Sequence, residues 1–141
     1  ICYYEVMKIF CTNAFTGEDF DTVSRRMKAV VNALNNAGHE AYCPIFDSHK
    51  IELQAKNDTR AIFNYAFTNI ANSDAMVAII TSDRKSEGQL MEAGAALAAN
   101  KPLFAFIHQS AAQSPTHLTK LAEKTFIWST DQELTDVLTH I

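Results

Sequence analysis

The chain has 141 residues, of which 48% are hydrophobic and 20% are charged, and its formal net charge at pH 7 is -4. A chain of this length and apolar content can bury the core of one ordinary domain, so we expect residues 1–141 to form a single domain. The acidic balance argues against a nucleic acid and against an anionic membrane surface as partners. No apolar stretch approaches the roughly 18 residues that a membrane span requires.

Three cysteines occur, Cys2, Cys11 and Cys43, and none forms a CxxC pair. An odd number without this spacing suits a reduced, cytoplasmic protein better than a disulfide framework. The first six residues are apolar but lack a basic region and a long hydrophobic segment, so they match a signal peptide poorly. No two histidines show HxxxH spacing. We therefore expect no metal site, and we assign no cofactor.

The first third of the chain predicts a strand, a helix and a second strand. Residues 6–12 are apolar enough for a strand, and a loop follows to Gly17. Apolar residues step by three and four from about residue 18, which predicts an amphipathic helix that Gly38 ends. Residues 40–45 predict a short strand. The next eleven residues or so, which include Asp47 and Lys50, show no clear period, and we interpret them as a loop able to contribute to a binding site.

Helices and strands continue to alternate to the end of the chain. A helix is predicted from Asn57 or Asp58 to about residue 72, and unbroken apolar runs predict strands at 75–81 and 103–108. The helix between these strands begins with a capping box of Ser86 and Gln89 and stops near Asn100. A short helix through residue 122, a strand at 125–128 and a terminal helix complete the pattern.

Two local signals mark the last helices. Ser114 and Pro115 have the N-cap and N1 signature of the short helix, and Thr130 with Glu133 forms the capping box of the terminal one. The alternating order predicts an α/β fold, a doubly wound, flavodoxin-like or Rossmann-like sheet of five parallel strands with helices on both faces. We expect the strand order 2-1-3-4-5.

This order predicts where a ligand binds. In such sheets ligands lie outside the carboxyl ends of the strands where the order reverses, here between the first and third strands. The loops at this point are residues 12–17 and 81–88. The second loop ends on a helix N-terminus, whose free N–H groups suit a phosphate or carboxylate. The sequence therefore predicts a site for a small anionic metabolite.

Three motifs carry a family resemblance. Asn72-Ser73-Asp74 leads into the apolar strand, the pattern Ser86-x-Gly88-x-x-x-Glu92-x-Gly94-x-Ala96 opens the next helix, and Lys101-Pro102 follows it. Together with the first strand and loop at residues 8–15, these motifs resemble the nucleoside 2-deoxyribosyltransferase family and its hydrolase branch, the 2′-deoxynucleoside 5′-phosphate N-glycosidases. The resemblance covers most of the chain.

The resemblance implies a covalent mechanism. Glu92 corresponds to the family's nucleophile, which attacks the anomeric carbon and releases the nucleobase, after which a second base or water resolves the glycosyl ester. We expect the helix N-terminus to help keep Glu92 ionised. Asp74 corresponds to a family acid near the sugar and base. It would orient the ribose or Glu92, or assist protonation of the leaving group.

Ser86 favours one branch of the family. The transferase branch tends to carry an acid here, whereas the nucleotide-hydrolase branch carries serine. The Ser86 hydroxyl and the Gly88 amide would accept a 5′-phosphate, which Arg84 and Lys85 would attract. The resemblance thus implies a nucleoside monophosphate as substrate and water as acceptor. It also implies a hydroxyl from a neighbouring subunit, supplied by Ser114 or Thr116, and hence a homodimer.

The first loop departs from the family. It reads Thr12-Asn13-Ala14-Phe15 where the family is usually small or glycine-rich, and Ile9 stands where a tyrosine is often found. Asn13 would hydrogen-bond the sugar or the phosphate, and Phe15 would stack on the base.

Each candidate also has a purely structural reading. Ser86 is a complete helix cap, Glu92 an exposed helix residue, Asp74 a helix cap and Phe15 a packed side chain. Besides the enzyme, a nucleotide-binding or sensor module without turnover fits the same fold. A relative of the flavin-binding flavodoxins is the weaker alternative, because the loop at residues 12–17 lacks a hydroxyl-rich phosphate cradle.

Overall fold

A five-stranded sheet forms the centre of the protein, whose computed structural model describes residues 5–15, 17–114 and 116–141. All strands are parallel and their order is β2-β1-β3-β4-β5. This is the predicted order, so the reversal lies between β1 and β3. The strands are β1 (Lys8–Asn13), β2 (Glu40–Tyr42), β3 (Ala75–Ile80), β4 (Leu103–His108) and β5 (Lys124–Trp128).

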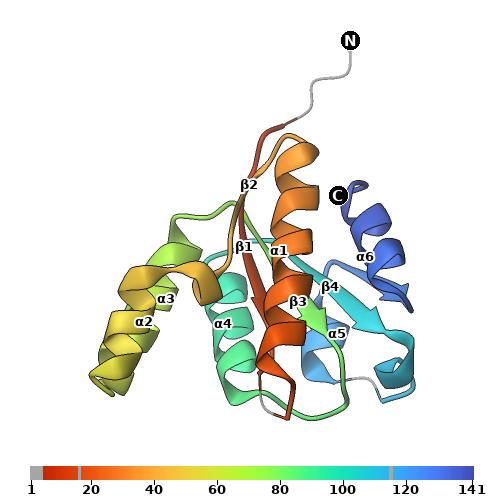
Figure 1. Cartoon of the computed structure of the whole chain (residues 1–141). Coiled ribbons are helices and arrows are strands. Elements are labelled where there is room, and N and C mark those ends of the chain that lie inside the picture. The colour runs from red at the N-terminus through yellow and green to blue at the C-terminus, as the bar shows by residue number, and fades with distance from the viewer. Residues whose placement is uncertain (1–4, 16, 115) are drawn as a thin grey trace.

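Helices cover both faces of this sheet (Figure 1). Helices α1 (Phe20–Asn36) and α6 (Asp131–Leu138) pack on one face, and α3 (Thr59–Ala71), α4 (Glu87–Ala98) and α5 (His117–Leu121) on the other. Strand β3 serves both layers, because Val77 and Ile79 belong to the core under α1 while Met76 and Ala78 belong to the core under α3 and α4. Burial on both faces explains the unbroken apolar run, and the predicted α/β class is confirmed.

Three of the predicted signals at helix ends, Gly38, Asn100 and Asp58, act as predicted. Gly38 and Asn100 have φ angles of 96° and 56°, and this left-handed conformation ends α1 and α4. Asp58 caps α3 by accepting a hydrogen bond of 3.1 Å from the backbone nitrogen of Ala61. Such caps contribute about 1 kcal/mol each. The helix boundaries therefore follow from short-range chemistry.

The segment after β2 differs from the predicted loop. Residues 44–46 form a 3₁₀ turn, η1 (Pro44–Phe46), and helix α2 (Ser48–Ala55) follows. Prediction of a loop was wrong because α2 buries no residue, so its sequence carries no apolar period. The side chain of Asp47 holds the first turn, and α2 packs beside α3 at the edge of the molecule (Figure 1).

Helix α5 begins later than predicted. Its N-cap is Thr116, and the backbone nitrogen of Thr116 donates a hydrogen bond of 3.0 Å to the Thr119 hydroxyl. Ser114 lies before the helix and is exposed, and its nitrogen donates to the carbonyl of Ala111 at 3.1 Å. Pro115 lies outside the described residues. The capping box at Thr116 therefore decides the start of α5.

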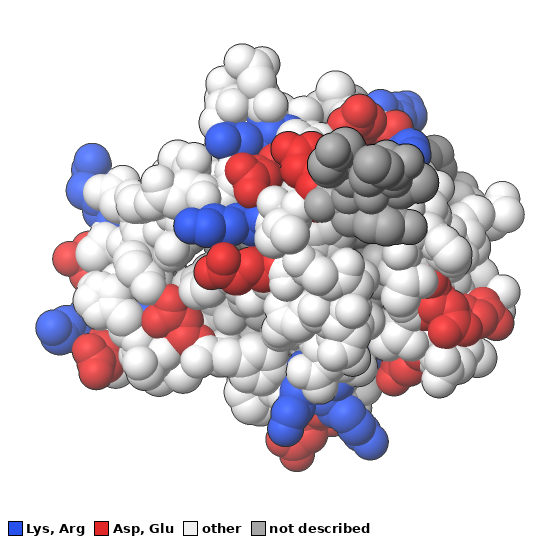
Figure 2. Space-filling view, turned by 90° about the horizontal axis from the view of Figure 1, so that it is seen from above, with Lys and Arg blue, Asp and Glu red and all other residues white. Residues whose placement is uncertain are grey.

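Charged side chains of both signs are interspersed on the face that Figure 2 shows, in keeping with the slightly acidic net charge of the chain. Among the described residues, no helix combines the length and the apolar character needed to cross a membrane.

Candidate active site

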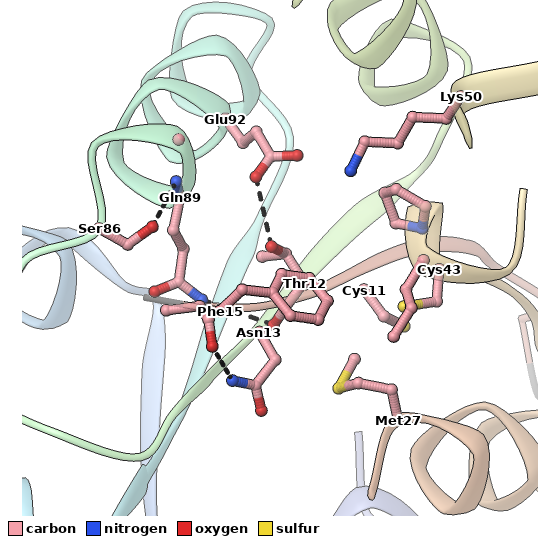
Figure 3. Close-up of a pocket in the computed structure, with 14 residues that line it drawn as sticks. Cys11, Thr12, Asn13, Phe15, Met27, Cys43, Lys50, Ser86, Gln89 and Glu92 are labelled. Carbon is pink, nitrogen blue, oxygen red and sulfur yellow. Dashed lines mark hydrogen bonds between the residues drawn. The ribbon is translucent and has the colours of Figure 1, made fainter. Parts of the chain in front are cut away.

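A pocket of about 180 Å³ opens at the carboxyl end of β1. Its walls come from the end of β1 and the following loop, from α1, from the segment after β2 and the start of α2, and from the first turns of α4 (Figure 3). These segments are far apart in the sequence and meet beside the point where the strand order reverses. The pocket therefore occupies the position that the topology predicts for a ligand.

Glu92 supplies the only carboxylate among the described residues that line this pocket. It lies in the second turn of α4 and is half-buried. The hydroxyl of Thr12, near the end of β1, donates a hydrogen bond of 3.2 Å to Oε1 of Glu92. Figure 3 shows the carboxylate directed into the pocket, toward Lys50 on the opposite wall.

The ionisation of Glu92 is set mainly by burial. Burial raises the pKa of Glu92 to about 7, while the positive charge of Lys50 and the hydrogen bond from Thr12 act in the opposite direction. The carboxyl group is therefore divided between its two forms near neutral pH. The helix N-terminus was expected to keep Glu92 ionised, but burial outweighs any such effect.

The start of α4 is fixed to the sheet by Gln89. Ser86 caps the helix by accepting a hydrogen bond of 3.3 Å from the Gln89 nitrogen, which is one half of the predicted capping box. The buried Gln89 side chain does not bond the backbone nitrogen of Ser86, which would be the other half of the box. It donates to the carbonyls of Ile79 at 3.1 Å and Thr12 at 3.5 Å. The loop with Ser86 and Gly88 is thereby held against the ends of β1 and β3.

The first loop contributes Asn13 and Phe15. Asn13 is 5% exposed, and its Nδ2 donates to the carbonyl of Ala14 at 2.8 Å, while its Oδ1 has no partner among the described residues. Phe15 is 39% exposed, and its ring stacks on that of Phe20 with centroids 6.2 Å apart. Six of the predicted residues thus line one pocket: Thr12, Asn13, Phe15, Ser86, Gly88 and Glu92.

A smaller hollow of about 70 Å³ adjoins this pocket and shares Ser86 and Gln89 with it. Its lining includes the basic side chains of Arg84 and Lys85. Thr116, which was expected to reach a phosphate from a neighbouring subunit, lines this hollow within the same chain. A positive hollow next to a helix N-terminus suits an anionic group.

Asp74 is not brought to the pocket. It lies at the start of β3, where its Oδ2 accepts a hydrogen bond of 2.8 Å from the nitrogen of Lys8. The six residues of β3 span about 20 Å, so Asp74 and the pocket lie at opposite edges of the sheet. Asp74 was expected near the sugar and base, and the structure does not bring it to this pocket; its side chain instead links β1 to the start of β3. Ser114 likewise lines neither hollow.

Lys50 lies in the segment that was interpreted as a loop able to contribute to a binding site, but it was given no role of its own. It enters the pocket from α2, which lacks an apolar period. The available signal was Asp47, a good N-cap directly before Ser48. The pocket also contains two thiols, and burial raises the pKa of Cys11 well above its usual range and that of Cys43 to about 12. Both thiols therefore stay neutral and are poor nucleophiles.

No cluster of three or more metal-ligating side chains occurs within the part of the chain that the structure describes.

Comparison with known proteins places this site in a family. The sequence profile described as nucleoside 2-deoxyribosyltransferase matches residues 10–131. Among solved structures, the chain is similar to the CMP N-glycosidase BcmB of Clostridium botulinum, with 15% identity, 93% of this chain and 96% of that chain covered, and a TM-score of 0.67. It is also similar to a 2-deoxyribosyltransferase of Bacillus psychrosaccharolyticus, with 16% identity, 92% and 90% covered, and a TM-score of 0.62.

A third similar structure is a conserved protein of Enterococcus faecalis, with 17% identity, 96% and 99% covered, and a TM-score of 0.57. At these identities the likeness shows a shared fold. A comparison with curated protein sequences gives no match. The profile, however, spans most of the chain, and the chain therefore belongs to the nucleoside 2-deoxyribosyltransferase family, which cleaves or transfers the N-glycosidic bond of nucleosides.

Proposed function

We propose that this chain cleaves the N-glycosidic bond of a 2′-deoxynucleoside 5′-monophosphate, with Glu92 as nucleophile and water as final acceptor. The observation that carries the proposal is a single half-buried carboxylate, held by Thr12, in the same pocket as the start of α4. Transfer to a second base, or an unphosphorylated nucleoside as substrate, is the neighbouring possibility within the family.

The chemistry follows from a carboxylate nucleophile. One oxygen of ionised Glu92 attacks the anomeric carbon, the bond from that carbon to the base nitrogen breaks, and its electron pair leaves with the base. Water then attacks the same carbon and the bond from that carbon to the Glu92 oxygen breaks, through oxocarbenium-like transition states in both steps. The proton that the water loses balances the proton that the released base takes up. Oε1 accepts the hydrogen bond from Thr12, so Oε2 is the oxygen that we assign to the attack.

Two features support a 5′-phosphate. The first turn of α4 presents free N–H groups beside Ser86 and Gly88, and the adjoining hollow adds Arg84 and Lys85. A substrate whose sugar lies at Glu92 would extend its phosphate into this hollow. Because Thr116 lines the hollow within one chain, this contact needs no second subunit. The homodimer is a separate proposal, which sedimentation tests.

The test is an incubation of the protein with deoxynucleosides and their 5′-monophosphates, with and without a free acceptor base, followed by chromatography. We expect release of free base from the monophosphates, its loss in Glu92→Ala, and a glycosyl adduct on Glu92 in the mass spectrum of a rapidly quenched reaction. Ser86→Asp should weaken turnover of monophosphates more than Ser86→Ala, because a carboxylate repels the phosphate. Base exchange on unphosphorylated nucleosides would instead identify a transferase.

The second candidate is a nucleotide-binding module without turnover. It is favoured by the position of Asp74, which leaves Glu92 as the only carboxylate among the described residues of the pocket. Among the described residues of the pocket there is no second carboxylic acid to protonate a leaving base. Binding of a monophosphate by calorimetry, without base release in the same panel, would support this candidate over the enzyme.

A further inference from the structure

Lys50 and Glu92 are the only charged side chains among the described residues that line the pocket. Figure 3 shows the ammonium group of Lys50 directed toward the Glu92 carboxylate from the opposite wall. The ion pairs found within the described residues do not include this pair, so the two charges face each other with the pocket between them. Lys50 therefore acts on Glu92 through space, without a direct contact.

The turn of α2 that carries Lys50 is held by Asp47. Its Oδ1 accepts hydrogen bonds from the backbone nitrogens of His49 at 2.9 Å and Lys50 at 3.3 Å. Its Oδ2 accepts the phenol hydrogens of Tyr42, at the end of β2, and Tyr65, in α3. One carboxylate thus ties α2 to the sheet and to α3, and this tie sets where Lys50 enters the pocket.

Asp47 stays charged while Glu92 titrates. Burial by itself would raise the pKa of Asp47, but hydrogen bonds from the phenols of Tyr42 and Tyr65 and from the helix N–H groups outweigh it and lower the pKa. The anchor of α2 is therefore intact on both sides of neutral pH.

The other hydroxyl and thiol groups that line the pocket near Glu92 are neutral near pH 7. Strand β1 presents the Thr12 hydroxyl and the Cys11 thiol, and the segment before η1 presents the Cys43 thiol. Burial raises the pKa of both thiols, as described above. Helix α3 packs against α4, and its charged side chain, Arg60, is exposed. Among the described residues that line the pocket, Lys50 is thus the one charged group that acts on Glu92.

We propose that Lys50 is a positioning residue that holds Glu92 in its charged form, and that Asp47, with Tyr42 and Tyr65, fixes the helix turn that carries Lys50. A nearby positive charge favours the ionised form of a half-buried carboxylate. The inference rests on the proposed function, because only ionised Glu92 can attack the anomeric carbon. It requires no contact between Lys50 and the substrate.

The test is a carbon-13 NMR titration of the glutamate carboxyl groups in the full chain, with Glu92→Gln to assign the signal. In Lys50→Met we expect the pKa of Glu92 to rise by about one unit, and in Lys50→Arg to stay near the wild-type value. Lys56→Met is the matched control, because Lys56 is an exposed lysine at the other end of the same helix. Its Glu92 titration should equal that of the wild type.

Kinetics give the second readout. In Lys50→Met, kcat/KM at pH 6.5 should fall about tenfold and recover toward the wild-type value at pH 9, because the acidic limb moves with the Glu92 pKa. An unchanged Glu92 titration would overturn the proposal, as would a rise in KM at every pH, which would mean that Lys50 binds substrate directly. The NMR titration needs no substrate, so it tests the effect of Lys50 on Glu92 even if the wild type shows no turnover. Absence of turnover would contradict the proposed function only.

Asp47→Asn tests the anchor separately. Asparagine still caps a helix, but it is a weaker acceptor for two phenols. We expect the Glu92 titration to shift in the same direction as in Lys50→Met, by less. If Lys50→Met shifts the titration and Asp47→Asn does not, Lys50 keeps its role and the part assigned to Asp47 is wrong.

Discussion

Thr12 and Glu92 are 80 positions apart in the chain and are joined by a hydrogen bond of 3.2 Å from the threonine hydroxyl to Oε1. The bond links the end of β1 to the second turn of α4, and Gln89 links the same two elements one turn earlier. It orients one carboxylate oxygen and leaves the other directed at the pocket (Figure 3). The position of the proposed nucleophile therefore depends on the packing of the end of a strand against the start of a helix that is distant in sequence.

Thr12→Val removes this hydrogen bond and keeps the shape of the side chain. Hydrogen bonds to charged groups contribute about 1.5–3 kcal/mol, so we expect kcat/KM at pH 7 to fall about tenfold or more, with partial recovery at pH 8.5. Release of free base measured by chromatography checks this. Thr125→Val, at an exposed position of β5, is the control and should keep full activity. Equal activity of both variants would remove Thr12 from the mechanism.

Activity should depend on pH through Glu92, because burial raises the pKa of this group to about 7. The nucleophile is the ionised form, so kcat/KM should rise through pH 7 and reach a plateau about one unit above it. A pH–rate profile of the wild type checks the pH at which kcat/KM rises. A limb near the ordinary value for glutamate, about 4.3, would show that Glu92 is solvated in the working enzyme.

The same raised pKa predicts an effect on stability. Unfolding restores the ordinary pKa of Glu92, so between about pH 4.5 and pH 7 the unfolded chain binds fewer protons at this group than the folded one. Ionisation of Glu92 therefore lowers the free energy of unfolding as the pH rises through this window. The free energy of unfolding of Glu92→Gln, relative to that of the wild type, should therefore rise by on the order of 1 to 3 kcal/mol between pH 4 and pH 8.

Urea unfolding at the two pH values measures this gain. Glu87→Gln is the control, since Glu87 is exposed in the first turn of the same helix, and it should show no such gain. The same stability difference from wild type at both pH values for Glu92→Gln would contradict the raised pKa.

Asp74→Ala separates the structural role from the catalytic one. The substitution removes the acceptor of the Lys8 N–H bond at the start of β1, and we expect the free energy of unfolding to fall by about 1 kcal/mol. Because Asp74 lies at the opposite edge of the sheet from the pocket, kcat should stay within twofold of the wild type. A loss of kcat of a hundredfold or more in a folded variant would return Asp74 to the mechanism.

Gly17→Ala probes the loop between β1 and α1. Gly17 has a φ angle of 78°, and a Cβ atom there would lie 2.0 Å from a guanidinium nitrogen of Arg84. Gly38, with a φ angle of 96° and nothing within 4 Å of such an atom, is the matched control. Both substitutions should cost about 1 kcal/mol of stability. Gly17→Ala should also displace Arg84 and raise KM for monophosphates several-fold, with little change for nucleosides, whereas Gly38→Ala should change neither KM.

The core elements were predictable because their signals are local. The unbroken apolar runs of β3 and β4, the capping Ser86, and the left-handed Gly38 and Asn100 each depend on residues within a turn or two. The alternation of strands and helices then leaves few topologies, and the predicted strand order is the one observed. In α2 the prediction failed because that helix has no buried face of its own and so shows no apolar period, although Asp47 caps it and α3 packs beside it.

The sequence by itself determined the class of fold, the edge of the sheet at which a ligand would bind, and the residues of the two loops that meet there. The tertiary structure decided which charged groups share the pocket. Asp74 follows the family spacing but lies at the amino end of its strand, whereas Lys50 comes from a helix without an apolar period and faces Glu92. Burial of Glu92 likewise depends on distant segments that close around it, and short-range patterns carry no information about such contacts.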